Sequence, residues 1–168
     1  MDSEKVYKMS FFRHLYYIFL SLIFFLIVPG IVIYSVIKGN SDVPYLGMFI
    51  YWHIFGIFFI PGFILHSSYY VNDRNKTIKI DEFENITISN DYEIVTIKKP
   101  YIETITNHHS GIHNSTTWNG YNYSVIKLKN GQKYIITCLI IGIDELDKRL
   151  SGRILIRKNH FISTLNYQ

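Results

Sequence analysis

Three histidines stand close together in the chain, at His108, His109 and His113. Imidazole nitrogens are common ligands of transition metals, so this spacing makes the three residues candidate metal ligands. A protein zinc site is usually completed by cysteine, histidine or carboxylate groups, and neither a cysteine nor a pair of carboxylates stands nearby. Residues 108–122 are otherwise rich in Ser, Thr, Asn and Gly, which is typical of a solvated loop. We therefore favour a polar loop over a metal site and expect no cofactor.

Sequence motifs of common enzymes are missing from the chain. It has no glycine-rich phosphate loop, no G-x-S-x-G, no H-E-x-x-H and no cysteine pair for zinc. The single cysteine, Cys138, lies in an apolar stretch, where burial opposes formation of the reactive thiolate. We therefore expect a protein that is not an enzyme.

Two groups of basic residues could bind an anionic surface. The first group is Arg74, Lys76 and Lys79, and the second is Lys148, Arg149, Arg153, Arg157 and Lys158. A basic side chain near an anionic membrane gains about 1 kcal/mol, although ordinary solvated faces would explain both groups. The loop aromatic Trp118 could contact a partner. From His66 onward 13 Lys+Arg face 10 Asp+Glu, an excess too small to indicate nucleic-acid binding.

These residues follow two long apolar runs. Residues 15–37 carry no charge, and residues 43–71 carry none apart from His53 and His66. A bilayer-spanning helix needs roughly 20 apolar residues, so the sequence predicts a transmembrane hairpin over 15–66, with helices at 15–37 and 45–66. It divides the chain into a basic N-terminus (1–14), the hairpin and a β domain (67–168). Basic residues flank the hairpin on both sides, which predicts that both polar parts are cytoplasmic.

Each apolar run contains a Pro-Gly pair, at Pro29 and at Pro61. Proline inside a helix removes one backbone hydrogen bond and kinks the chain. A transport role would use such kinks as hinges, with His53 as the ionisable group. Because no acidic or basic side chain accompanies them, we favour kinks that serve helix packing.

Beyond the runs, alternating residues predict strands. A first hairpin is expected over 67–72 and 76–81, and further strands at 84–90, 92–98 and 101–107. Asn130-Gly131 predicts a hairpin between 123–129 and 132–138, with both turn residues at positive φ as in a type I′ turn. Asp144 is placed to cap a helix over about 144–151. Residues 153–160 fit either a helix or a strand.

This order of elements resembles the bacterial pleckstrin-homology-like (bPH) membrane proteins, especially the small form with an N-terminal transmembrane hairpin. The resemblance rests on a hairpin that runs directly into SYYVNDRNKTIKI (68–80), on SVIKLKNGQKYIITCL (124–139) and on the closing helix. It implies an α+β membrane protein whose PH-like antiparallel barrel or bent sheet has about seven strands and a C-terminal helical cap. It also implies a bacterial inner or plasma membrane location. Eukaryotic relatives bind phosphoinositides through basic residues in the first hairpin, where this chain has Arg74 and Lys76.

The leading hypothesis is a non-enzymatic integral membrane protein. Its PH-like domain would bind a protein partner, or self-assemble, at the cytoplasmic membrane surface. The alternative is recognition of anionic lipid by the same domain. A third and less favoured hypothesis is a transport or metal-handling accessory protein. Expected partners are the bilayer and a protein or second copy, without nucleic acid. Candidate lipid- or partner-binding residues are Arg74, Lys76, Lys79, Trp118, Arg149, Arg153 and Arg157.

Overall fold

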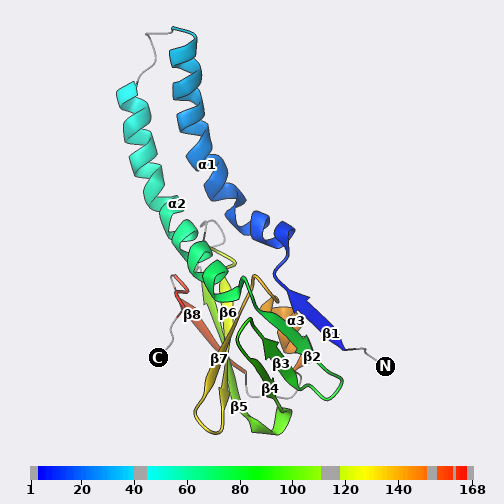
Figure 1. The fold of residues 1–168 in the computed structure, drawn as a ribbon. Coiled ribbons are helices and arrows are strands. Elements are labelled where there is room, and N and C mark those ends of the chain that lie inside the picture. The colour runs from blue at the N-terminus through cyan, green and yellow to red at the C-terminus, as the bar shows by residue number, and fades with distance from the viewer. Residues whose placement is uncertain (1–3, 40–44, 111–117, 151–154, 161, 166–168) are drawn as a thin grey trace.

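The computed structural model describes residues 4–39, 45–110, 118–150, 155–160 and 162–165. Two helices rise from one end of a β domain that holds both sheets and a short helix (Figure 1). The helices are α1 (Phe11–Ile37), α2 (Tyr45–Asp73), the 3-10 turn η1 (Lys99–Tyr101) and α3 (Ile143–Arg149). The strands are β1 (Lys5–Lys8), β2 (Thr77–Ile80), β3 (Ile86–Ser89), β4 (Ile94–Ile97), β5 (Ile102–Ser110), β6 (Asn122–Leu128), β7 (Lys133–Thr137) and β8 (Leu155–His160).

The predicted transmembrane hairpin is wrong. Among the described residues, no single helix is long and apolar enough to cross a membrane. Helix α1 bends by 56° between Phe11–Phe19 and Ser21–Ile37. Only the two parts together have the length and apolar composition of a membrane-spanning segment. The last turns of α2 pack inside the protein, because Leu65, His66 and Tyr69 are each at most 2% exposed. The apolar run therefore continues into the core of the β domain.

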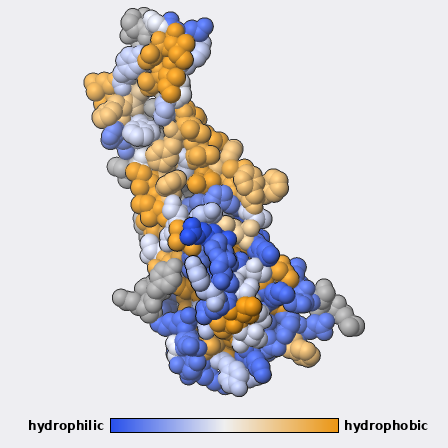
Figure 2. Space-filling model, viewed as in Figure 1, coloured by the Kyte–Doolittle hydropathy of each residue, from blue (hydrophilic) through white to orange (hydrophobic). Residues whose placement is uncertain are grey.

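Hydrophobic side chains nevertheless cover much of the helix pair. Figure 2 shows them along the upper part of the molecule, above a mostly hydrophilic β domain. Phe12 and Leu46, for example, are 81% and 73% exposed. Large exposed apolar surfaces promote association, and this affects how the chain must be handled in solution.

The strands form two four-stranded sheets, not one bent sheet of about seven strands. Their orders are β1-β2-β3-β4 and β7-β6-β5-β8. Strand β1 pairs antiparallel with β2 although both long helices stand between them in the chain. The N-terminal segment expected to flank a membrane helix thus supplies an edge strand of the first sheet. Glu145 of α3 holds β1 in place, since it accepts hydrogen bonds from Lys5 Nζ at 2.8 Å and Tyr7 Oη at 3.0 Å.

Two details of the predicted strands also differ. The first hairpin is wrong, because residues 67–72 continue α2, whose buried residues Leu65, Tyr69 and Asp73 recur every four positions. The β6–β7 hairpin is confirmed, but only Gly131 has a positive φ, at 87°. Gly131 N donates to Leu128 O at 2.9 Å, which fits a type I turn closed by a glycine bulge instead of a type I′ turn.

Residues 153–160 were ambiguous in sequence, and the part of them that the structure describes, Leu155–His160, forms β8, which pairs parallel with β5. The core between the sheets consists mainly of isoleucines from alternating strand positions, including Ile78, Ile86, Ile105 and Ile126, each 0% exposed. Leu146 of α3 and Leu150, directly after the helix, pack onto this core. Asn107, also 0% exposed, joins α3 to β5 through hydrogen bonds to the Asp147 carboxylate at 2.9 and 3.1 Å.

Candidate functional site

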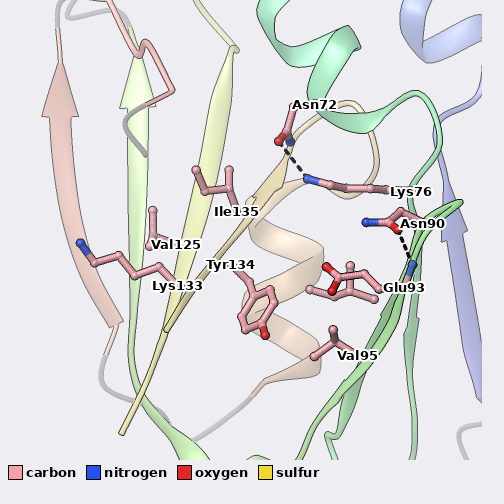
Figure 3. A pocket seen from close by; sticks show the side chains of 10 residues that line it. Asn72, Lys76, Asn90, Glu93, Val95, Val125, Lys133, Tyr134 and Ile135 are labelled. Carbon is pink, nitrogen blue, oxygen red and sulfur yellow. Dashed lines mark hydrogen bonds between the residues drawn. The ribbon is translucent and has the colours of Figure 1, made fainter. Parts of the chain in front are cut away.

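A cavity of about 260 Å³ opens between the two sheets, below the end of α2 (Figure 3). Its walls come from β3 and β4 on one side and from β6 and β7 on the other. Strands β4 and β7 are edge strands, because each pairs with only one neighbour in its sheet. The cavity therefore lies where two unpaired strand edges of the described chain approach each other.

The end of α2 supplies one polar wall of the cavity. Asn72 and Lys76 stand four residues apart, and Lys76 Nζ donates to Asn72 Oδ1 at 2.8 Å. The carboxamide nitrogen of Asn72 donates in turn to Asp73 Oδ1 at 2.6 Å. Burial lowers the pKa of Lys76, against the opposing effect of the Asp73 charge. An ammonium group held in this way gains from any additional anionic partner.

Asp73 links this wall to the protein core. Its carboxylate is 0% exposed and accepts a hydrogen bond from the Thr137 hydroxyl of β7. Burial raises the pKa of Asp73 to about 6, although the hydrogen bond from Thr137, the Lys76 charge and the hydrogen bond from Asn72 each lower it. Perturbed buried carboxyls of this kind are common next to functional sites.

A tight turn between β3 and β4 places the opposite polar group. Asn90 Oδ1 accepts hydrogen bonds from the backbone nitrogens of Tyr92 at 2.9 Å and Glu93 at 2.8 Å. Asparagine favours turns because its side chain can make these local bonds. The turn presents the Glu93 side chain at the cavity, across from Lys76 (Figure 3).

Apolar side chains cover the inner part of the cavity. Ile88 and Val95 come from the first sheet, and Val125 and Ile135 from the second. Lys133 and Tyr134 of β7 complete the lining. The cavity thus combines an apolar interior with a rim that carries two lysines, one glutamate and two asparagines. This arrangement can bind a side chain that is apolar at its tip and polar around its base.

Of the residues singled out in sequence as lipid or partner contacts, Lys76 is the one among those described that lines this cavity. Arg74 is exposed in the turn after α2, and Arg157 is exposed on β8. Lys79 forms an ion pair with Glu4 at 3.2 Å, and Arg149 lies 3.6 Å from the Glu145 carboxylate. Trp118 is only 5% exposed. Arg153 lies outside the described residues.

The histidines predicted to lie in a polar loop are in part strand residues. His108 and His109 belong to β5, so their side chains point to opposite faces of the sheet. His108 Nδ1 lies 2.8 Å from His160 Nε2 of β8, and its ring stacks on Tyr123. His113 lies outside the described residues. In the part of the chain that the structure describes, no three His, Cys, Asp or Glu residues are grouped to hold a metal ion.

Most residues of the cavity were not identified from sequence. Asn72, Glu93 and Lys133 lie far apart in the chain. Asn72 and Lys133 stand in the two stretches that carry the family resemblance, but that resemblance assigned them no contact. Asn90-Asp91 is a recognisable turn signal, but it does not indicate which cavity the turn faces. Their convergence depends on how the two sheets pack.

The comparison with known families identifies the β domain. A family model described as "PH domain" matches residues 6–149. The chain belongs to this family. No curated protein and no solved structure matches the chain. The match begins in β1 and ends with α3, so it includes the helix pair but not β8. The bacterial origin suggested by the narrower resemblance stays a prediction.

PH domains are generally non-catalytic modules that bind lipids or proteins, and no enzyme family is indicated. The domain found here is compatible with either class of ligand.

Proposed function

We propose that this PH domain binds an extended segment of a protein partner in the cavity between β4 and β7. The observation that carries the proposal is the apolar cavity between two unpaired strand edges. An edge strand offers backbone donors and acceptors to an added strand, while pockets beside it select alternate side chains.

The dimensions fit such a segment. β4 contains 4 residues and β7 contains 5, which is the length of a short added strand. Exposed apolar groups continue the edge beside the cavity, with Tyr92 94% and Ile94 74% exposed. A partner residue with a large apolar side chain would enter between Val95 and Ile135, and a carboxylate next to it would meet Lys76.

The charges favour a protein over an anionic lipid. Glu93 faces the same cavity as Lys76 and Lys133, so the rim is mixed in sign. Lys79 and Arg149, two of the candidate lipid contacts, are already paired with carboxylates. The predicted cytoplasmic location of the interaction stays a prediction.

Site-specific photo-crosslinking in cells tests the proposal. A benzoylphenylalanine in place of Tyr134 is expected to capture a protein partner, whereas the same residue in place of Tyr101, which is exposed outside the cavity, is not. Lys76→Gln removes the charge that would meet the partner carboxylate but keeps a donor for Asn72, so it should reduce capture at Tyr134 while leaving the circular dichroism spectrum unchanged.

Equal capture at both positions would contradict the proposal. Capture of a second copy alone would favour self-assembly, and capture of lipid alone would favour the anionic-lipid alternative. Either result would remove the partner protein from this site.

A further inference from the structure

We propose that a second cavity, at the β8 edge of the second sheet, is a binding site for a phosphate group. The cavity measures about 350 Å³ and lies between the end of β5, the turn before β6 and β8. Strands β7 and β8 form the two opposite edges of this sheet. The proposed phosphate site is therefore separate from the cavity between β4 and β7, and neither proposal depends on the other.

The lining of this cavity is rich in hydrogen-bond donors. It includes the guanidinium of Arg157, the imidazole of His109 and the carboxamides of Asn119, Asn122 and Asn159, with no carboxylate. Arginine binds phosphate oxygens through paired N–H groups. A cavity lined by one guanidinium, one imidazole and three amides matches the acceptor-only surface of a phosphate.

Strand register brings these groups to one side of the sheet. In the parallel β5–β8 pair, Asn107 lies opposite Arg157 and His109 opposite Asn159. Alternate residues of a strand share a face, so Arg157 and Asn159 project on the same side as His109. Lys158, between them, projects on the other side. The two strands thus direct one strong cation and two further polar groups to the same place.

Among the described residues, one side chain of the lining has a buried nitrogen without a hydrogen bond, and another is bonded through its acceptor oxygen. His109 Nε2 is buried and makes no hydrogen bond among the described residues, and leaving a buried polar atom without a partner destabilises the folded state. Asn122 uses its carboxamide oxygen to accept from Ser110 N at 3.3 Å, which leaves its NH₂ group as the end that can meet an anion. A phosphate oxygen would satisfy both.

The surrounding charges agree with this assignment. Burial and the nearby Arg157 charge lower the pKa of His109, while Asp144 and Asp147 of α3 raise it. Those two carboxylates are not part of the lining, and Asp147 accepts hydrogen bonds from Asn107. A bound phosphate would offset the charge of Arg157 and favour the protonated form of His109.

Thermal unfolding of the full chain tests the site, with inorganic phosphate compared with chloride at equal ionic strength. Phosphate is expected to raise Tm in a saturable manner. Arg157→Gln removes the charged hydrogen bonds and should raise the phosphate concentration that gives half of the maximal Tm increase by about tenfold or more. Lys158→Gln removes the same charge one residue away, on the other face of the sheet, and should leave this phosphate concentration unchanged.

A Tm rise no larger than that with chloride, or equal weakening by both variants, would overturn the proposal. His109→Asn provides an independent variant and is expected to weaken phosphate binding as well. Vesicles of phosphatidylcholine with phosphatidic acid distinguish the source of the phosphate. If Arg157→Gln weakens both vesicle and phosphate binding, the site takes a lipid headgroup. If it weakens only phosphate binding, the ligand is a free phosphate compound.

Discussion

Replacing Asp73 by asparagine should change how the stability of the folded chain depends on pH. The Asp73 carboxyl is fully buried, and hydrogen bonds from Thr137 and Asn72 reach its two oxygens. Burial is the largest influence and raises its pKa from 3.8 to about 6. Asparagine has nearly the same shape and can take part in similar hydrogen bonds, but it does not ionise in this range.

The direction of the effect follows from proton binding. Between pH 3.8 and about 6 the folded chain keeps the Asp73 proton, whereas the unfolded chain releases it. The contribution of Asp73 to stability is therefore greatest below pH 3.8 and is lost as the pH rises to 6. Each pKa unit corresponds to about 1.4 kcal/mol, so this loss is about 3 kcal/mol. The stability of Asp73→Asn relative to the natural chain should rise by that amount between pH 3.5 and pH 7.

Urea unfolding at a series of pH values measures this difference. The buried Trp118 provides a fluorescence signal from the domain core. A mild non-ionic detergent should be present throughout, because the exposed apolar side chains of the helix pair favour association. Taking the difference between the two chains cancels the titration of every other group, provided that the mutation does not alter it.

A pH-independent difference would refute a raised pKa for Asp73. A difference that falls as the pH rises would show that the hydrogen bonds and Lys76 outweigh burial. Thr137→Val supplies a second check, since losing the hydroxyl that stabilises the carboxylate should raise the pKa of Asp73 further and move the transition to higher pH.

Three more predictions concern stability. Burial and the adjacent His14 lower the pKa of His66 from 6.5 to about 4, so the contribution of His66 to the free energy of unfolding is complete above pH 6.5 and is lost as the pH falls towards 4. His66→Gln, which retains a group able to meet Tyr121 and His14, should make the free energy of unfolding in urea less dependent on pH between 4 and 6.5, and an unchanged pH dependence would contradict this. Asn107→Ala breaks buried hydrogen bonds to Asp147 at 2.9 Å and from Ser124 at 2.7 Å and should cost about 2–3 kcal/mol in urea unfolding; a cost below half of that would mean that water replaces the amide. Gly131 has φ 87° and open space around it, so Gly131→Ala should lower the stability of the folded chain by about 1–2 kcal/mol. Gly30→Ala, inside α1 with equal space, should leave the stability unchanged or raise it, and equal effects of the two variants on Tm would exclude backbone conformation as the cause.

Local patterns predicted much of the β domain. Alternation of Ile86 and Ile88 marked β3, and Asn130-Gly131 marked the β6–β7 hairpin, because these signals depend on residues a few positions apart. The same signals did not specify the turn type, since only Gly131 takes a positive φ. They also did not show that β5 extends to Ser110, because the pairing partners of its last residues are on β6 and β8.

The candidate site was predicted only through Lys76. The basic residues around it attracted attention by their charge, but charge alone does not show that Lys79 and Arg149 pair with Glu4 and Glu145. Likewise Trp118, which a loop would expose, fills a core cluster with Tyr69 and Tyr121. Pairing and burial depend on segments that are distant in the chain.

The sequence by itself determined the apolar helices, strands β2 to β7 and the β6–β7 hairpin, because period and turn chemistry are local properties. Only the tertiary structure decided what the apolar runs do. A run of uncharged residues looks the same whether lipid or protein surrounds it, and here the last turns of α2 lie against the sheets, with Tyr69 and Asp73 buried. The tertiary structure also decided that β1 joins β2 across the helix pair, and that two strand edges enclose the cavity. These pairings are set by the packing of distant segments into one core, which no local pattern records.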